Sequence, residues 1–160
     1  MRKLAKILTA IAMALLIFLL IAFYGVTLRV EVIGFSPQSA RTNPTLTQEL
    51  VESARRNDML SNRFRIPTRD SLDSYQLIFI ELRVRNIGLL PAEWVQIRLS
   101  PDPMDVALFP NSEGDVPGFG SSREISATLL AEAEAPSASR AMWIDYYVFG
   151  RKFEVPIALQ

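Results

Sequence analysis

The chain has 160 residues and a formal net charge of zero, and it contains neither cysteine nor histidine. Those two absences exclude disulfides, cysteine nucleophiles, histidine-based catalytic triads and the common zinc ligand sets. Arg2, Lys3 and Lys6 precede a long apolar run, so the rest of the chain is acidic by about three charges, which argues against nucleic-acid binding.

The first predicted element is an apolar helix over residues 7–26, preceded by a short tail, residues 1–6. Twenty helical residues span about 30 Å, the thickness of the hydrocarbon core of a bilayer. The run is apolar on every side, which is typical of a helix surrounded by lipid or by a large protein core. Because the remaining domain is too small for such a core, we expect a transmembrane anchor. The residues expected to contact lipid and its outer interface are Leu15, Leu16, Phe18, Leu19, Phe23 and Tyr24.

The main alternative to a retained anchor is a cleaved signal peptide. The apolar region of a signal peptide is usually about 7–15 residues long and is followed by small residues at the cleavage site. The run here is longer, and Tyr24 follows Ala22 and Phe23 where a small residue is needed. We therefore favour a retained anchor over a signal whose cleavage would leave a chain starting near Thr27. A buried helix of a soluble protein is the third interpretation.

The basic residues at the N-terminus predict the orientation of this helix. They flank only its first end, and the positive-inside rule then places the N-terminus in the cytoplasm. The domain formed by residues 27–160 is expected in the periplasm or outside the cell, tethered to the cell (inner) membrane.

The outer domain is predicted to begin with a strand and to contain one inserted helix. Apolar and polar residues alternate after Gly25, and the stretch 36–45 is rich in turn-forming residues, which predicts a loop. A thin apolar stripe predicts a helix over about residues 46–58, with Thr45 and Gln48 as a capping box. Residues 61–74 show no firm element.

Alternating patterns predict further strands, which are expected at 75–86, 92–100, 104–109 and 123–130, with a turn-rich loop at 110–122. The clearest hairpin joins 141–149 to 152–159 through Gly150 and Arg151, a two-residue loop expected to form a type II′ turn. Pro156 lacks an amide hydrogen, which predicts an edge strand or a bulge. The residues expected to share the inward faces are Ile78, Ile80, Leu82, Val84, Val95, Ile97, Leu99, Ile125, Ala127 and Leu129.

Six or seven short strands separated by turns predict a mainly β fold, an antiparallel sandwich. Within it, residues 82–101 resemble a pattern of immunoglobulin-like adhesion and cell-surface modules of the CARDB and NEW3 type. The matching residues are Val84, Asn86, Gly88, Ala92, Val95, Ile97 and Leu99. The resemblance implies an immunoglobulin-like sandwich with a binding or spacer role and no chemistry of its own. The inserted helix departs from the compact pattern of these modules.

Acidic residues gather in one loop, at Asp102, Asp105, Glu113 and Asp115. Converging carboxylates can bind calcium, and a pair of them can hydrolyse glycosides. The spacing of an EF-hand is absent and several prolines stiffen the stretch, so we favour a solvated loop and expect no metal site.

Two further clusters are candidates for binding. The densest basic stretch is proposed as a partner surface for anionic headgroups or an acidic protein, against the simpler interpretation of a solvated face with local ion pairs; its residues are Arg55, Arg56, Arg63, Arg65 and Arg69. On the penultimate strand, Trp143, Tyr147 and Phe149 alternate with Met142, Ile144, Tyr146 and Val148. One of these two sets should be core. The other is expected either to lie under the inserted helix, which we favour, or to form an exposed aromatic strip.

The sequence therefore predicts a single-pass membrane protein with a non-catalytic role in binding or assembly, for example as an accessory subunit of an envelope complex. Its expected partners are the lipid bilayer and another membrane or envelope protein, with no nucleic acid and no cofactor. The alternatives are a secreted carbohydrate-binding or hydrolase-associated module, released by signal cleavage, and a carboxylate-based enzyme.

Overall fold

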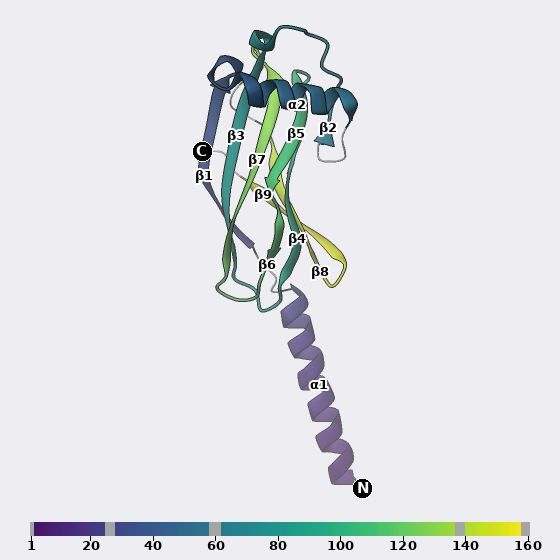
Figure 1. Ribbon diagram of the computed structural model, residues 1–160. Helices are drawn as coiled ribbons and strands as arrows, with labels where there is room; N and C mark the ends of the chain where they lie inside the picture. Colours follow the sequence, from purple (N-terminus) through teal and green to yellow (C-terminus); the bar gives the residue numbers. More distant parts are fainter. Residues whose placement is uncertain (1, 25–27, 58–61, 137–139, 158–160) are drawn as a thin grey trace.

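The computed structural model describes residues 2–24, 28–57, 62–136 and 140–157. Its N-terminal helix, α1, runs from Arg2 to Tyr24 and extends away from a β-rich domain (Figure 1). The helix therefore begins earlier than predicted and takes in most of the predicted tail. The predicted end of the helix, at residues 25 and 26, lies outside the described residues.

The domain is mainly β. After β1 (Leu28–Ser39), a short 3-10 turn leads into α2 (Pro44–Arg56), and a second 3-10 turn precedes β3. The remaining strands are β2 (Asn62–Arg63), β3 (Tyr75–Asn86), β4 (Ala92–Leu99), β5 (Asp105–Ser112), β6 (Gly114–Val116), β7 (Ser122–Glu132), β8 (Met142–Val148) and β9 (Arg151–Ile157).

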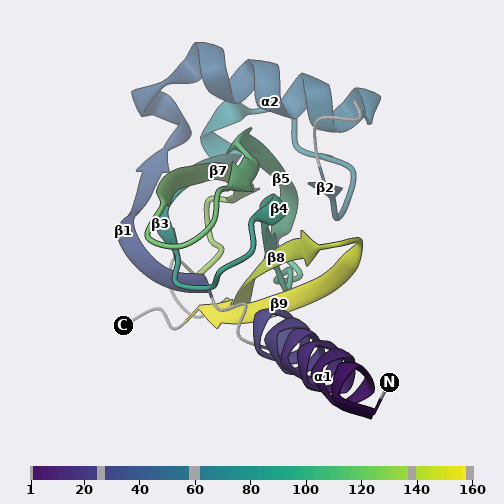
Figure 2. The ribbon, with the colours of Figure 1, turned by 90° about the horizontal axis from the view of Figure 1, so that it is seen from below.

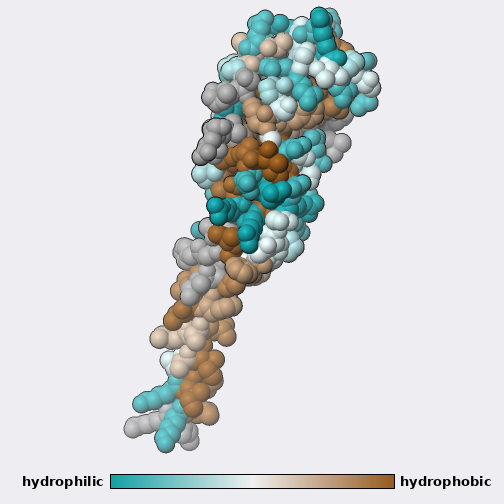
Figure 3. All heavy atoms as spheres, turned by 90° about the vertical axis from the view of Figure 1, so that its left-hand side faces the viewer, coloured by the Kyte–Doolittle hydropathy of each residue, from teal (hydrophilic) through white to brown (hydrophobic). Residues whose placement is uncertain are grey.

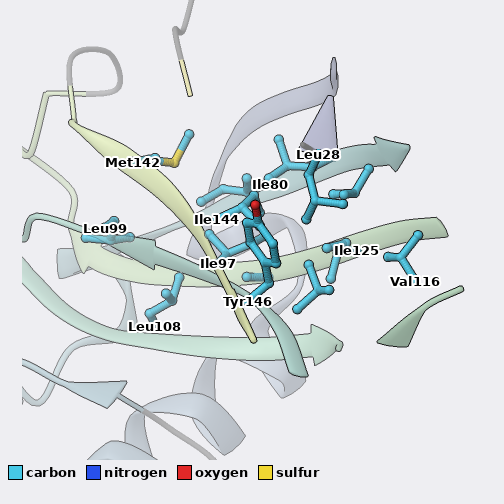
Figure 4. Packing of buried hydrophobic residues seen from close by; sticks show 14 of the residues in the cluster. Leu28, Ile80, Ile97, Leu99, Leu108, Val116, Ile125, Met142, Ile144 and Tyr146 are labelled. Carbon is cyan, nitrogen blue, oxygen red and sulfur yellow. The ribbon is translucent and has the colours of Figure 1, made fainter. Parts of the chain in front are cut away.

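These strands form two antiparallel sheets packed face to face. One has the order β1-β3-β7-β5-β2 and the other the order β6-β4-β8-β9. Apolar side chains from both sheets meet between them, for example Ile80 and Ile125 from the first against Ile97, Ile144 and Tyr146 from the second (Figure 4). All the residues that the alternation placed on inward faces are buried, which confirms those predictions.

A second, smaller core lies on the outer face of the five-stranded sheet, under α2. Val51 and Ala54 of the helix pack there with Leu77, Phe109 and Leu130 of the sheet. This explains why β3 carries apolar residues on both faces near its start, where a strand exposed to water on one face would alternate strictly. In Figure 2, α2 lies on the opposite side of the domain from β8 and β9.

The start of α2 differs from the predicted capping box. Asn43, and not Thr45, is the N-cap, because its side chain accepts a hydrogen bond from the amide of Leu46 at 3.3 Å. Pro44 follows at the first helical position, where its fixed φ suits the helix and no amide hydrogen is needed. The helix ends at Asn57 in the left-handed conformation, with φ 59°.

Two predicted loops contain strand. β1 continues through the predicted loop to Ser39, and Pro37 pairs with Ile78. A proline is tolerated there because β1 is an edge strand of its sheet. The loop predicted at 110–122 contains the end of β5 and all of β6, whose three residues are too few to show an alternating pattern.

The last hairpin forms where it was predicted, but its turn lies one residue earlier than predicted. Val148 pairs with Arg151, so the loop residues are Phe149 and Gly150. Both have positive φ, at 49° and 74°, as a type I′ turn requires, in place of the predicted type II′ turn. β9 is an edge strand, as the position of Pro156 predicted.

The two ends of the sandwich differ in what they carry. We call the end at which β1 begins the proximal end, because α1 precedes it in the chain. The other end, the distal end, carries α2 (Figure 1). The twelve residues of β1 separate the two ends by about 35–40 Å at ~3.3 Å per residue.

Candidate membrane anchor and interaction surfaces

Among the side chains that the structure describes, those of helix α1 take no part in either core of the domain. Both clusters of buried residues begin at Leu28 or later in the chain. In the window Lys3–Leu20, no residue is buried. Apolar residues cover most of the visible face of α1, and hydrophilic residues gather at its N-terminal end (Figure 3). The helix is thus long and apolar enough to cross a membrane, and a signal sequence would meet the same description.

The predicted anchor residues that the structure describes are all exposed. Leu15, Leu16, Phe18 and Leu19 each expose about half of their surface, between 47% and 59%. The side chains of Phe23 and Tyr24 lie outside the described residues. Three residues separate the end of α1 from the first residue of β1, and an extended chain joining Tyr24 to Leu28 reaches at most ~14 Å. The start of β1 therefore lies close to the end of the helix.

The predicted basic surface lies at the distal end, and several of its arginines make internal contacts. Arg55 pairs with Asp70 at 3.1 Å and also donates to the carbonyl of Arg69. Arg63 donates to the carbonyl of Ala54, in the last turn of α2, where a cation complements the helix dipole.

Arg65 and Arg69 neutralise a buried carboxylate. Both form ion pairs with Glu132, whose side chain is only 8% exposed, and the Arg69 distance is 3.2 Å. Arg65 also donates to the carbonyl of Pro103 at 2.8 Å. A buried carboxylate without such partners would be strongly unfavourable, so these two arginines serve the fold. Arg55 and Arg56, exposed at the end of α2, are the members that a partner could reach most readily.

The predicted acidic cluster is divided among structural contacts. Asp105 is fully buried and paired with Arg140. Asp102 accepts a hydrogen bond from the amide of Met104, and Asp115 accepts one from the amide of Trp94. Within the described residues, no group of three or more acidic side chains converges as a metal site would require.

The aromatic residues of β8 lie on the two faces of the sheet as predicted. The element expected to cover the outer-face residues, α2, does not lie over them. Tyr146 is core, together with the three aliphatic residues of its face. Trp143 and Tyr147 are half-buried on the outer face of the four-stranded sheet. That face is not the one covered by α2, so the expected burial under the inserted helix is wrong. The Arg98 guanidinium lies over the Trp143 ring, 4.7 Å from its centroid.

The same outer face holds a charged network that the sequence did not reveal. Asp145 is 2% exposed, and its Oδ2 accepts hydrogen bonds from Arg98 and Lys152, both at 2.8 Å. Glu154 pairs with the same two cations. The hydrogen bond with Asp145 raises the pKa of Arg98, and the hydrogen bonds with Asp145 and Glu154 raise the pKa of Lys152. The partners of Asp145 come from two neighbouring strands, β4 and β9, whose register the sequence does not show.

One oxygen of this network lacks a partner. Oδ1 of Asp145 is buried and accepts no hydrogen bond within the described part of the chain. A pocket opens beside the network, lined by Asn62 and Leu108 of the five-stranded sheet, by Phe64 just after β2, and by residues 96–99 of β4.

No protein-family model matches this chain, and no curated protein matches its sequence.

Proposed function

We propose that this chain is a single-pass membrane protein that holds a binding module outside the membrane, with its N-terminus in the cytoplasm. The observation that carries the proposal is the exposed apolar helix α1, joined by three residues to a domain whose cores do not use it. The three basic residues at its start support the orientation. The domain then lies in the periplasm or on the cell exterior, held at the cell (inner) membrane.

We also propose that the domain is immunoglobulin-like. If β1, β3, β4, β5, β7, β8 and β9 are lettered A to G in chain order, the observed sheets read A-B-E-D and C-F-G. That is the strand arrangement of a constant-type immunoglobulin sandwich. β2, β6 and α2 are additions to that arrangement. Modules of this architecture are rigid scaffolds whose surfaces and loops bind partners.

The role proposed for the module is binding or assembly without catalysis. The buried carboxylates of the described residues are engaged in ion pairs, as with Asp105 on Arg140 and Glu132 on Arg65. Their interactions hold loops and strands together, which suits a scaffold. Arg55 and Arg56 on α2 are proposed to contact an acidic surface of another membrane or envelope protein. Their position at the distal end supports a protein partner over the headgroups of the membrane that holds α1.

Membrane anchoring and orientation are tested together by single cysteines, because the natural chain has none. Ser100→Cys lies on an exposed site of the domain, and Lys3→Cys lies at the start of α1. In cells with a permeable outer envelope, an impermeant maleimide should label only the first variant. The protein should resist alkaline extraction and keep its full mass. Labelling of Lys3→Cys alone, or a soluble chain lacking its first residues, would contradict the proposal.

The partner surface is tested by charge reversal in the same membranes. Arg55→Glu combined with Arg56→Glu should abolish crosslinking from a photoreactive residue at Glu49, on the same helix. A matched reversal at the proximal end, Arg29→Glu with Arg85→Glu, should leave that crosslink unchanged. Equal crosslinking in both double variants would show that Arg55 and Arg56 do not contact the partner.

A further inference from the structure

Large apolar side chains are exposed at the proximal end of the domain. Outside α1, seven large apolar residues of the described chain are exposed, and five of them lie at or beside this end. They are Ile87 at 46%, Leu89 at 55%, Trp94 at 75%, Phe119 at 73% and Phe149 at 66% exposed. Single exposed apolar residues are ordinary on a protein surface, whereas a group of them at one end marks an interaction site for a protein partner or a membrane.

Strand pairing brings these residues to the end from which α1 leaves. Leu28, the first residue of β1, pairs with Asn86 at the end of β3, so the loop 87–91 extends past the start of β1. Ala92 pairs with Val116, which places the loop 117–121 at the same end. The turn of the last hairpin follows because Glu93 pairs with Tyr147.

Two of these loops are fixed to one another by Asn86. Its side-chain amide donates to the carbonyls of Leu90 and Pro117, at 2.7 and 2.9 Å, and its Oδ1 accepts from the amide of Gly88. Gly118 lies against the loop 87–91, because a Cβ there would come within 2.8 Å of the carbonyl oxygen of Leu89. The proximal end is therefore a built surface on which the exposed residues keep their relative positions.

The backbone at two of the exposed aromatic residues is strained. Trp94 has φ 54° and Phe149 has φ 49°, a conformation that bulky residues rarely adopt. Trp94 occupies a bulge of β4, where the pairing with β8 shifts register between Glu93 and Gln96. Strain of this kind is retained where the side chain serves a purpose, since glycine or asparagine would suit the backbone better.

Four exposed arginines lie near this end, together with the acidic Glu93 and Asp115 beside Trp94. Arg29 and Arg85 pair directly across β1 and β3, a like-charge arrangement that is unfavourable unless an anion lies nearby. Arg123 and Arg151 are also exposed there, at the start of β7 and of β9. Exposed arginines around apolar tips are suited to the phosphates and acyl-chain boundary of a lipid surface.

We propose that the proximal end docks on the outer surface of the bilayer that holds α1. Trp94, Phe119 and Phe149 enter the interface, where aromatic rings are favoured, and Arg29 and Arg85 contact lipid phosphates. The inference rests on the proposed anchoring and adds to it a fixed orientation of the sandwich, upright on the membrane, with α2 and its arginines directed away. A partner would then bind the distal end at a fixed distance from the bilayer.

The two tryptophans provide the test, because both lie in the domain and none lies in α1. The full chain is reconstituted in vesicles with lipids brominated near the headgroup, which quench only tryptophans in contact with them. Trp143→Phe leaves Trp94 as the probe, and Trp94→Phe leaves Trp143, which is half-buried on the outer face of β8, as the matched control. Trp94 should lose most of its emission and shift to the blue, while Trp143 should keep its emission.

The outcomes distinguish docking from anchoring. Alkaline extraction of the same vesicles shows whether α1 is inserted, and failure there contradicts the proposed function. An inserted protein with unquenched Trp94 overturns the docking inference and leaves the anchor intact. Equal quenching of both tryptophans also overturns it, since the domain would then lie on its side.

The contribution of charge is tested with anionic vesicles containing phosphatidylglycerol. Arg29→Glu with Arg85→Glu should reduce the quenching of Trp94. Arg55→Glu with Arg56→Glu makes the same change of charge at the distal end and should leave the quenching unchanged. If both double variants behave alike, lipid phosphates are not contacts of Arg29 and Arg85, and the inference as stated is wrong.

Discussion

Arg140 and Asp105 form a bidentate ion pair in the interior of the distal end. Nε of Arg140 lies 2.8 Å from Oδ2 of Asp105, and Nη2 lies 2.6 Å from Oδ1. The side chains are 4% and 0% exposed. Arg140 also donates to the carbonyl of Pro136, and Asp105 accepts from the amide of Asp102. The pair thus connects the chain before β8 to the start of β5.

Removing one member of this pair should destabilise the domain strongly. Arg140→Ala leaves a buried carboxylate without its partner, and we expect a loss of about 3–5 kcal/mol in the free energy of unfolding. Replacing both residues, with Asp105→Leu and Arg140→Met, should cost less than Arg140→Ala, because no charge is left unpaired. Chemical denaturation of the full chain in detergent measures both values. A loss below ~1 kcal/mol for Arg140→Ala, as for a surface pair, would show that the site is open to water.

Asn86 should prove more important than other side-chain amides of the domain. Asn86→Ala removes the donors to two loop carbonyls and the acceptor for Gly88, in a fully buried position, so we expect a loss of about 3 kcal/mol. Asn111 is exposed and makes a side-chain hydrogen bond to Thr128, and Asn111→Ala should cost less than ~1 kcal/mol. Thermal unfolding of the two variants compares them directly, and similar midpoints would contradict the role of Asn86 as the link between the loops.

The strands on either side of the loop after Asn86 show which features of the fold sequence patterns predict and which they miss. The alternating patterns on either side of residues 87–91 predicted where β3 ends and β4 begins, and they also predicted the inward faces of both strands. The same patterns missed β6, which is too short to show a period. They also missed the contacts of Glu132 with Arg65 and Arg69, because these depend on how distant segments meet in three dimensions.

The candidate surfaces were predictable to different degrees for the same reason. Composition alone identifies α1 and the cluster of arginines on and after α2. Which arginines have internal partners depends on the packing of α2 over the five-stranded sheet. The exposed proximal residues could not be grouped from sequence, because Trp94, Phe119 and Phe149 come from separate loops and strands.

Phe149→Asn should stabilise the fold while it weakens membrane docking. Asn-Gly is the preferred pair for a type I′ turn, whereas phenylalanine with φ 49° is strained. We expect a gain of about 1 kcal/mol in the free energy of unfolding. In vesicles, the same variant with Trp143→Phe should show reduced quenching of Trp94 by brominated lipid. Tyr147→Asn, two residues earlier on the strand, carries no such turn benefit and should not stabilise. A destabilised Phe149→Asn would mean that the ring stabilises the hairpin itself.

Tyr146 should make the stability of the domain fall at alkaline pH. Its side chain is 2% exposed and its ring stacks on Phe153 with centroids 5.5 Å apart. Burial raises the pKa of the Tyr146 phenol above its ordinary value. The unfolded chain therefore loses this proton first, near pH 10, while the folded chain retains it. The stabilisation is complete below that pH and is lost as pH rises toward the folded pKa, with a slope of up to ~1.4 kcal/mol per pH unit.

The variant Tyr146→Phe tests this, because it keeps the ring and removes the titrating proton. Its free energy of unfolding minus that of the natural chain should be larger at pH 11 than at pH 9, two values on either side of about pH 10. Measuring both proteins at both pH values cancels any constant effect of the substitution. A constant difference would show that the buried phenol is not linked to folding.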